Sequence, residues 1–255
     1  MANDKLIILI TGANQGLGYY AAQQLAATGK YHVLVGGRNS SKVKTAIETL
    51  TSDTAVEVQA SSLEPIQIDV TSDDSIRAAV ETVQKNHGKL DCLMNNAGIA
   101  GAQAAATDGS GPNLRELYRQ HYDTNLFGAA QTTEAFLPLL RKSTASGGKR
   151  ISFTSSGLSS LNWASEDGPY SAAMYPIYRS TKTALSMIML YYVKTLEKEG
   201  FVVSASDPGY CATNLNGNSG FKDPREGAKM LVQSVVEAKE KVHGLVVGDA
   251  GPEPW

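Results

Sequence analysis

A tyrosine and a lysine, Tyr178 and Lys182, are the pair of side chains best suited to chemistry in this sequence. On a helix, two residues at this spacing lie on one face, about one turn apart. A phenol has an ordinary pKa of about 10 and is a poor general base at neutral pH. A nearby cation favours the phenolate, so we expect Lys182 to lower the pKa of Tyr178 and let it exchange a proton with a substrate oxygen. Most chance occurrences of this spacing lie on solvated helix faces. Whether this pair is functional must therefore be judged from the rest of the sequence.

A glycine-rich segment follows the first apolar stretch of the chain. Residues 5–11 form a continuous apolar run, which is typical of a parallel strand buried on both faces. Gly12, Gly16 and Gly18 come next and lead into an alanine-rich helix that we expect to end near residue 28. Glycines let the backbone approach a pyrophosphate, and the N-terminus of the following helix offers free N–H groups. An ordinary tight turn is the alternative.

Arg38 and Asp69, each of which follows an expected strand, indicate which nucleotide would bind. An NAD site would place an acid about 20 residues beyond the glycines, but Arg38 stands there, after an expected strand at residues 31–35. A guanidinium matches a phosphate, so Arg38 favours the 2′-phosphate of NADP(H); an ordinary surface arginine is the alternative. Asp69 follows the expected strand 64–68 and is placed to meet an adenine edge, or else to cap the next helix.

Polar groups also follow the later expected strands, at residues 90–94, 150–154 and 201–205. Ligands bind beyond the carboxyl ends of strands in open α/β sheets, where these groups would gather. Ser156 could donate a hydrogen bond to a carbonyl oxygen there. The full set is Asn95–Asn96–Ala97–Gly98, Ser155–Ser156–Gly157 and Pro208–Gly209. Turns held by asparagine or serine side chains are the alternative interpretation.

Three further features concern a long helix and two loops. Asn125 lies within an expected helix at residues 114–141, where asparagine has poor propensity, so we expect it to have a special role unless it faces solvent. The aromatic loop, residues 158–176, contains Trp163, Tyr170 and Tyr175 and would line an apolar substrate pocket or form a packing cluster. Residues 214–222 are expected to form a lid.

Composition limits the class of protein. The chain has 255 residues, 42% of them hydrophobic, with a formal net charge of -2, which is typical of one soluble α/β domain. We expect neither a nucleic-acid nor a membrane partner, no signal peptide and no membrane span. Cys92 and Cys211 show no metal-binding spacing, so the sequence predicts reduced thiols, no metal site and a cytoplasmic location.

Together these motifs resemble the short-chain dehydrogenase/reductase family, nearly from end to end. Within it, Arg38 makes the chain most similar to NADP-dependent carbonyl reductases. The resemblance implies one Rossmann-like doubly wound domain over residues 1–255, with a seven-stranded parallel sheet in the order 3-2-1-4-5-6-7, flanked by helices. It also implies NADP(H) as cofactor and a small carbonyl or alcohol substrate, and it is compatible with a homodimer or homotetramer.

The resemblance assigns roles to the matching positions. Tyr178 would donate the proton in reduction, Lys182 would lower its pKa and hold the nicotinamide ribose, Ser156 would orient the carbonyl, and Asn125 would hold a water. The residues expected to bind the cofactor are Gly12, Asn14, Gln15, Gly16, Leu17, Gly18, Arg38, Asp69, Val70, Asn96, Ala97, Gly98, Tyr178, Lys182, Pro208, Gly209, Cys211 and Thr213.

Two positions depart from the family pattern. The stretch between Ser156 and Tyr178 is longer than in compact members, and Cys211 stands where a branched apolar residue is common. The hypothesis is an NADPH-dependent ketone or aldehyde reductase of secondary metabolism. The alternatives are a non-catalytic NADP-binding sensor or scaffold and an NAD-dependent alcohol dehydrogenase.

Overall fold

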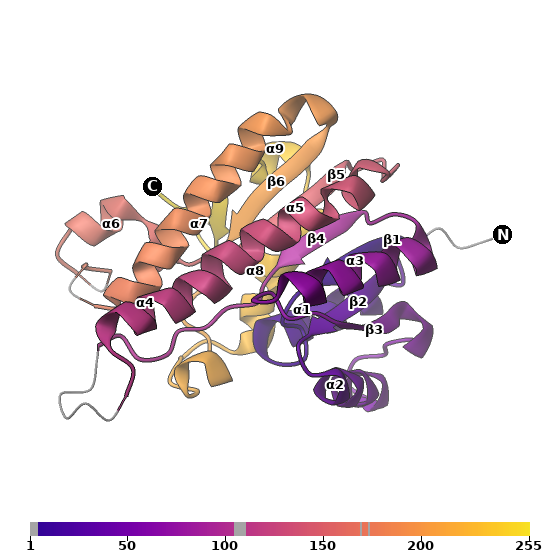
Figure 1. Cartoon of the computed structure of the whole chain (residues 1–255), viewed down its shortest axis with the longest axis horizontal. Coiled ribbons are helices and arrows are strands. Elements are labelled where there is room, and N and C mark those ends of the chain that lie inside the picture. The colour runs from indigo at the N-terminus through magenta and orange to yellow at the C-terminus, as the bar shows by residue number, and fades with distance from the viewer. Residues whose placement is uncertain (1–4, 105–110, 169, 173) are drawn as a thin grey trace.

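A computed structural model describes residues 5–104, 111–168, 170–172 and 174–255. Within them the chain forms one sheet covered by helices on both faces (Figure 1). None of the helices in this described part is long and apolar enough to cross a membrane.

The strands of the sheet lie in the order β3-β2-β1-β4-β5-β6-β7-β8. The first seven pair in parallel, which confirms the predicted fold and strand order. The two-residue β8 was not predicted; it pairs antiparallel with β7 and extends the sheet by a short edge. Their bounds are β1 Leu6–Ile10, β2 Tyr31–Gly37, β3 Leu63–Gln67, β4 Cys92–Asn95, β5 Lys149–Thr154, β6 Phe201–Ser206, β7 Val246–Gly248 and β8 Gly251–Pro252.

The helices cover the two faces because each presents an apolar stripe to the sheet. One face carries α3 (Asp73–His87), α5 (Gly128–Arg141) and α7 (Pro176–Thr195), whose apolar side chains share a core with the strands. The other face carries α1 (Gly16–Ala27), α2 (Ser40–Ser52) and α8 (Pro224–Val236). The shorter helical segments are α4 (Leu114–Tyr122), α6 (Leu161–Ser165), α9 (Lys239–Val242), η1 (Ala60–Ser62), η2 (Asp123–Phe127), η3 (Gly157–Ser159), η4 (Glu197–Glu199) and η5 (Asn214–Asn216).

The direction of the strand order changes at β1, which lies between β2 and β4. In open α/β sheets ligands bind at such a switch point, outside the carboxyl ends of the strands. The glycine-rich segment follows β1 there, and residues Asn96 to Gly98 follow β4 beside it. The topology therefore brings together the polar segments that the sequence singled out.

Phe136 of α5 tests how the core supports this arrangement, because its side chain is fully buried between the sheet and its covering helices. Replacing it by alanine removes buried apolar surface and leaves a cavity, so we expect Phe136→Ala to lower the free energy of unfolding by about 3–5 kcal/mol. Phe221, which is 89% exposed, supplies the matched control. Phe221→Ala should change the free energy of unfolding by less than about 0.5 kcal/mol. Urea denaturation followed by circular dichroism measures both, and equal effects would contradict this account of the core.

Candidate active site

The glycine-rich segment forms a tight turn between β1 and α1. Gly12 and Gly16 have φ angles of 64° and 60°, a conformation that side chains with a Cβ rarely adopt. Helix α1 begins at Gly16 with no capping side chain and no acidic residue in its first turn. Its first N–H groups and the positive end of its dipole are therefore suited to an anion such as a phosphate. Thr213 lies directly over this turn, since a Cβ at residue 16 would be 3.8 Å from its side chain.

Asn96, after β4, locks the glycine-rich turn in place. Its amide nitrogen donates to the carbonyl oxygens of Thr11 and Gly12, at 2.8 and 3.2 Å. The hydroxyl oxygen of Thr11 in turn accepts from the backbone N–H groups of Asn96 and Ala97. Gly18 packs so closely here that an added Cβ would lie 2.5 Å from the Asn96 amide nitrogen. Asn96 thus shapes the turn by pairing with its backbone, and its expected contact with the cofactor stays a prediction.

Arg38 lies just beyond β2, exposed to solvent, and within the described residues it forms no ion pair. A cleft of about 440 Å³ lies nearby between the glycine-rich turn and α2. Asn14, Gln15, Ser41 and Lys42 line it, together with side chains of α1 and α2. The region therefore carries two cationic side chains, several hydroxyls and two amides beside the helix N-terminus.

Asp69 and Val70 follow β3 at the same edge of the sheet. The Asp69 carboxylate accepts from the N–H and the hydroxyl of Thr71, at 3.0 and 2.7 Å, and forms a turn. It does not cap α3; that is done by Ser72, which accepts from the N–H of Ser75. Val70 is buried against Gly128 of α5, where an added Cβ would lie 2.7 Å from its carbonyl oxygen.

Asn125 is buried within η2, a π-helical turn that interrupts the helix expected at residues 114–141. Such turns inside helices often occur at functional sites. The Asn125 side chain accepts from the N–H of Ile99 at 2.8 Å and donates to the Ile99 carbonyl at 2.9 Å. It also donates to the Thr181 hydroxyl at 3.1 Å, next to Lys182 in α7. It therefore ties the segment after β4 to the helix that bears the Tyr–Lys pair, and does not face solvent.

The Tyr178–Lys182 pair lies on one face of α7, as the spacing predicts. The Lys182 ammonium is buried, donates to the Thr154 carbonyl at 2.7 Å and lies 5.5 Å from the centre of the Tyr178 ring. Ser156, after β5, lies close enough to the Tyr178 hydroxyl to lower its pKa. Gly98 faces the same ammonium, because a Cβ there would lie 3.7 Å from it. The structure thus brings together Ser156, Tyr178, Lys182 and the end of β4.

The pKa of Tyr178 is raised overall, and the shift has causes other than Lys182. Burial raises the pKa of Tyr178, the Asp207 carboxylate raises it further, and the hydrogen bond with Ser156 lowers it only in part. Burial also lowers the pKa of Lys182 to about 8. The cost of removing a phenolate from water therefore outweighs the hydrogen bond that favours it.

Asp207 is a residue of this site that the sequence analysis missed. It follows β6 directly, is 7% exposed and accepts from the N–H of Gly209 at 3.0 Å. Its carboxylate also lies against Gly157, where an added Cβ would be 3.0 Å from an oxygen. Burial raises the pKa of Asp207, and backbone hydrogen bonds from Gly209 and Gly157 oppose that change. Its position at the carboxyl end of a predicted strand was the available clue.

The aromatic loop packs beside Ser156 and Tyr178. The rings of Trp163 and Tyr170 lie 4.7 Å apart, and both would contact a Cβ at Gly157. Buried Arg179, next to Tyr178 in α7, holds this loop by donating to the carbonyls of Tyr170 and Ser171. Tyr175 is exposed and adopts a φ of 56° just before α7. The loop therefore forms a packed pair of Trp163 and Tyr170 beside the site, whereas Tyr175 is exposed and does not belong to it.

The segment after β6 returns to the glycine-rich turn. The Cys211 thiol is buried and donates to the Pro208 carbonyl at 3.2 Å, and burial raises its pKa to about 11. It packs against Gly227 of α8, which Leu17 also approaches. Cys211 and Cys92 are both free thiols, as predicted. In residues 214–222, the part proposed as a lid, the Asn214 amide donates to the Gln15 side chain at 3.4 Å.

The arrangement fits a dinucleotide laid across the switch point. The open N-terminus of α1 suits a pyrophosphate, Arg38 and Lys42 suit a further phosphate, and the site around Tyr178 suits a carbonyl oxygen. A nicotinamide dinucleotide, when bound, would supply hydride chemistry. The chain itself offers a hydroxyl and an ammonium for holding and moving a proton.

The effect of Asp207 on Tyr178 can be measured directly. Asp207→Asn removes a negative charge beside the phenol, so we expect a lower Tyr178 pKa than in the wild type. NMR titration of ¹³Cζ-labelled tyrosine, with Tyr178 assigned from Tyr178→Phe, would report it. Asp74→Asn, at an exposed position on α3, is the charge-matched control and should leave the pKa unchanged. An unchanged pKa in Asp207→Asn would contradict the assigned electrostatic coupling.

Comparison with known proteins agrees with this geometry. The family model described as short chain dehydrogenase matches residues 6–223. The short-chain dehydrogenase anuI of Penicillium roqueforti is 44% identical over 251 residues, covering 96% of this chain and 94% of that protein. The short-chain dehydrogenase/reductase tropE of Talaromyces stipitatus is 35% identical, covering 99% of each. The solved structure of an NADPH-bound carbonyl reductase from chicken fatty liver has a TM-score of 0.80 at 24% identity, covering 98% of this chain and all of that one. The chain belongs to the short-chain dehydrogenase family of oxidoreductases.

Proposed function

We propose that the protein reduces a ketone or aldehyde with NADPH, transferring a hydride while Tyr178 donates the proton. The observation that carries the proposal is the convergence of Ser156, Tyr178 and Lys182 at the carboxyl end of β5. In this proposal Ser156 would donate to the carbonyl oxygen and polarise the carbon toward hydride. Lys182 would hold a ribose hydroxyl, and Asn125 would hold a water of a proton relay.

The raised pKa of Tyr178 agrees with reduction as the working direction. A phenol that keeps its proton can give it to a nascent alkoxide, which is a far stronger base than a phenolate. Alcohol oxidation instead needs the phenolate, which burial and Asp207 disfavour. The aromatic pair Trp163 and Tyr170 supports an apolar carbonyl substrate, because it forms an apolar surface beside the reacting group.

The preference for NADPH rests on Arg38 and its surroundings. No acid occupies the position after β2 where a ribose 2′-hydroxyl would be bound, and Lys42 adds a second cation nearby. An arginine can bind a phosphate by two parallel hydrogen bonds. These features support the 2′-phosphate, whereas the likeness to the chicken enzyme supports the fold alone.

Removing the proton donor tests the mechanism. We expect Tyr178→Phe to lower the turnover of NADPH with a responsive ketone by at least about 100-fold, because a positioned acid is worth roughly 10²–10⁴ in rate. NADPH binding, followed by fluorescence, should persist. Tyr191→Phe, at an exposed position of the same helix, is the matched control and should keep full activity. Full turnover by Tyr178→Phe would refute the assignment, and a wild type that binds NADPH but reduces nothing in a broad panel of carbonyls would indicate a sensor or scaffold.

The cofactor preference is tested at Arg38. Arg38→Asp removes a charged hydrogen-bond donor and adds a group suited to a ribose hydroxyl, so kcat/KM should shift from NADPH toward NADH. A charged hydrogen bond worth about 1.5–3 kcal/mol corresponds to a change of roughly 10- to 100-fold in the ratio. Arg115→Asp, at an exposed position of α4, should leave the ratio unchanged. Equal use of both cofactors by the wild type would contradict the proposal.

A further inference from the structure

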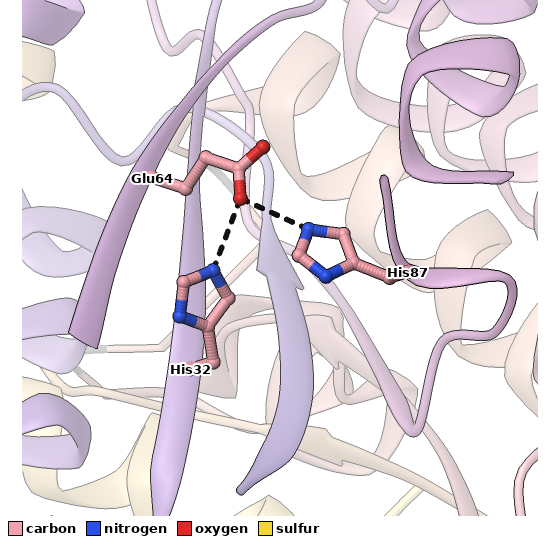
Figure 2. Close-up of side chains that lie close together, drawn as sticks. All are labelled: His32, Glu64 and His87. Carbon is pink, nitrogen blue, oxygen red and sulfur yellow. Dashed lines mark hydrogen bonds and ion pairs between the residues drawn. The ribbon is translucent and has the colours of Figure 1, made fainter. Parts of the chain in front are cut away.

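Three side chains that are distant in sequence meet at the opposite end of the sheet from Tyr178. His32 lies near the start of β2, Glu64 near the start of β3, and His87 is the last residue of α3 (Figure 2). The Nε2 atoms of His32 and His87 lie 3.1 and 2.9 Å from the same carboxylate oxygen, Oε2 of Glu64. Their register explains the meeting: Glu64 pairs with Leu34, two residues from His32 on the same face of the sheet, and α3 covers that face.

The chemistry of the cluster suits a transition-metal ion. Two imidazole nitrogens and one carboxylate oxygen are a donor set that binds zinc in proteins. The three ligand atoms lie within 4.8 Å of one another, so small side-chain movements would place them around one ion. The side chains are 21%, 24% and 15% exposed for His32, Glu64 and His87, so an ion could enter and a water could complete the coordination.

The surroundings orient two of the three groups. Nδ1 of His32 lies 3.2 Å from the Ser61 carbonyl, which can accept its proton. With a proton on Nδ1, His32 would offer the lone pair of Nε2 to a cation placed between it and the Glu64 carboxylate. The side-chain amide of Asn86 donates to the other carboxylate oxygen of Glu64 at 2.9 Å. Outer contacts of this kind typically fix the ligands of a metal.

The local charge also favours a cation. Glu64 contributes a carboxylate to the cluster, and among the described residues no lysine or arginine forms an ion pair with it. His87 ends α3, where the helix dipole places its negative end.

We propose that His32, Glu64 and His87 bind one Zn²⁺ ion, which links β2, β3 and α3 at the end of the sheet remote from the active site. The sequence predicts no metal site because the three ligands come from separate elements and show no recognisable spacing. The ion would be structural, since it lies at the amino ends of the strands, whereas Tyr178 and Ser156 lie at their carboxyl ends.

Isothermal titration of the full-length, chelator-treated protein with ZnCl₂ tests the proposal. We expect one equivalent of Zn²⁺ to bind and to raise the midpoint of thermal unfolding, because the ion binds the folded state. His87→Gln and Glu64→Gln should each weaken binding by more than the roughly 10- to 100-fold that an outer contact is worth. Asn86→Ala keeps all three ligands and should weaken Zn²⁺ binding by roughly 10- to 100-fold. It is a milder variant for the case in which a ligand variant fails to fold.

Glu81→Gln is the matched control, because it makes the same change at an exposed position of α3. It should bind Zn²⁺ as the wild type does. The proposal fails if the wild type shows no saturable binding, or if Zn²⁺ binds equally well to His87→Gln and Glu64→Gln. The latter result would place the ion on the other histidines or on the cysteines.

Discussion

The hydrogen bond from the Lys182 ammonium to the Thr154 carbonyl is the constraint on which the site depends. A buried ammonium is costly unless it is paired, and here the carbonyl at the end of β5 supplies the partner. Both ends of the bond are fixed by larger elements, the strand on one side and α7 on the other. A Cβ at Gly98 would lie 3.3 Å from the Asn125 side-chain oxygen and 3.7 Å from the ammonium. The ammonium therefore links β5 to α7 and lies beside the segment after β4.

Two asparagines extend this constraint to the loops. Asn96 holds the glycine-rich turn through the carbonyls of Thr11 and Gly12, and Asn125 holds Ile99 and Thr181. In both cases a side-chain amide, half-buried for Asn96 and buried for Asn125, pairs with backbone groups of a loop that would otherwise carry a desolvation penalty. These polar side chains therefore stabilise the loops of the site by pairing with their backbone groups. They let the loops keep one shape at the edge of the sheet, where the chain needs irregular backbone.

The sequence was sufficient for features that depend on neighbouring residues. Continuous apolar runs located the parallel strands, and the spacing of Tyr178 and Lys182 placed them on one helical face. The strand order came from the resemblance to a family. Features that depend on distant contacts were missed: the π-helical turn at Asn125, the short β8 and the burial of Asp207. The direction of the Tyr178 pKa shift belongs to this second group, because it depends on how far the folded chain excludes water from the phenol and on the Asp207 carboxylate after β6.

The burial that raises the pKa of Tyr178 also lowers that of Lys182, and the two effects together define what the pair can do. At neutral pH the phenol keeps its proton, while the lysine, with a pKa of about 8, is mostly charged. In the proposed reduction, such a pair would give a proton to a developing negative charge. A phenolate left after proton transfer would lie near the Lys182 ammonium, in a setting where opposite charges attract more strongly than they do in water.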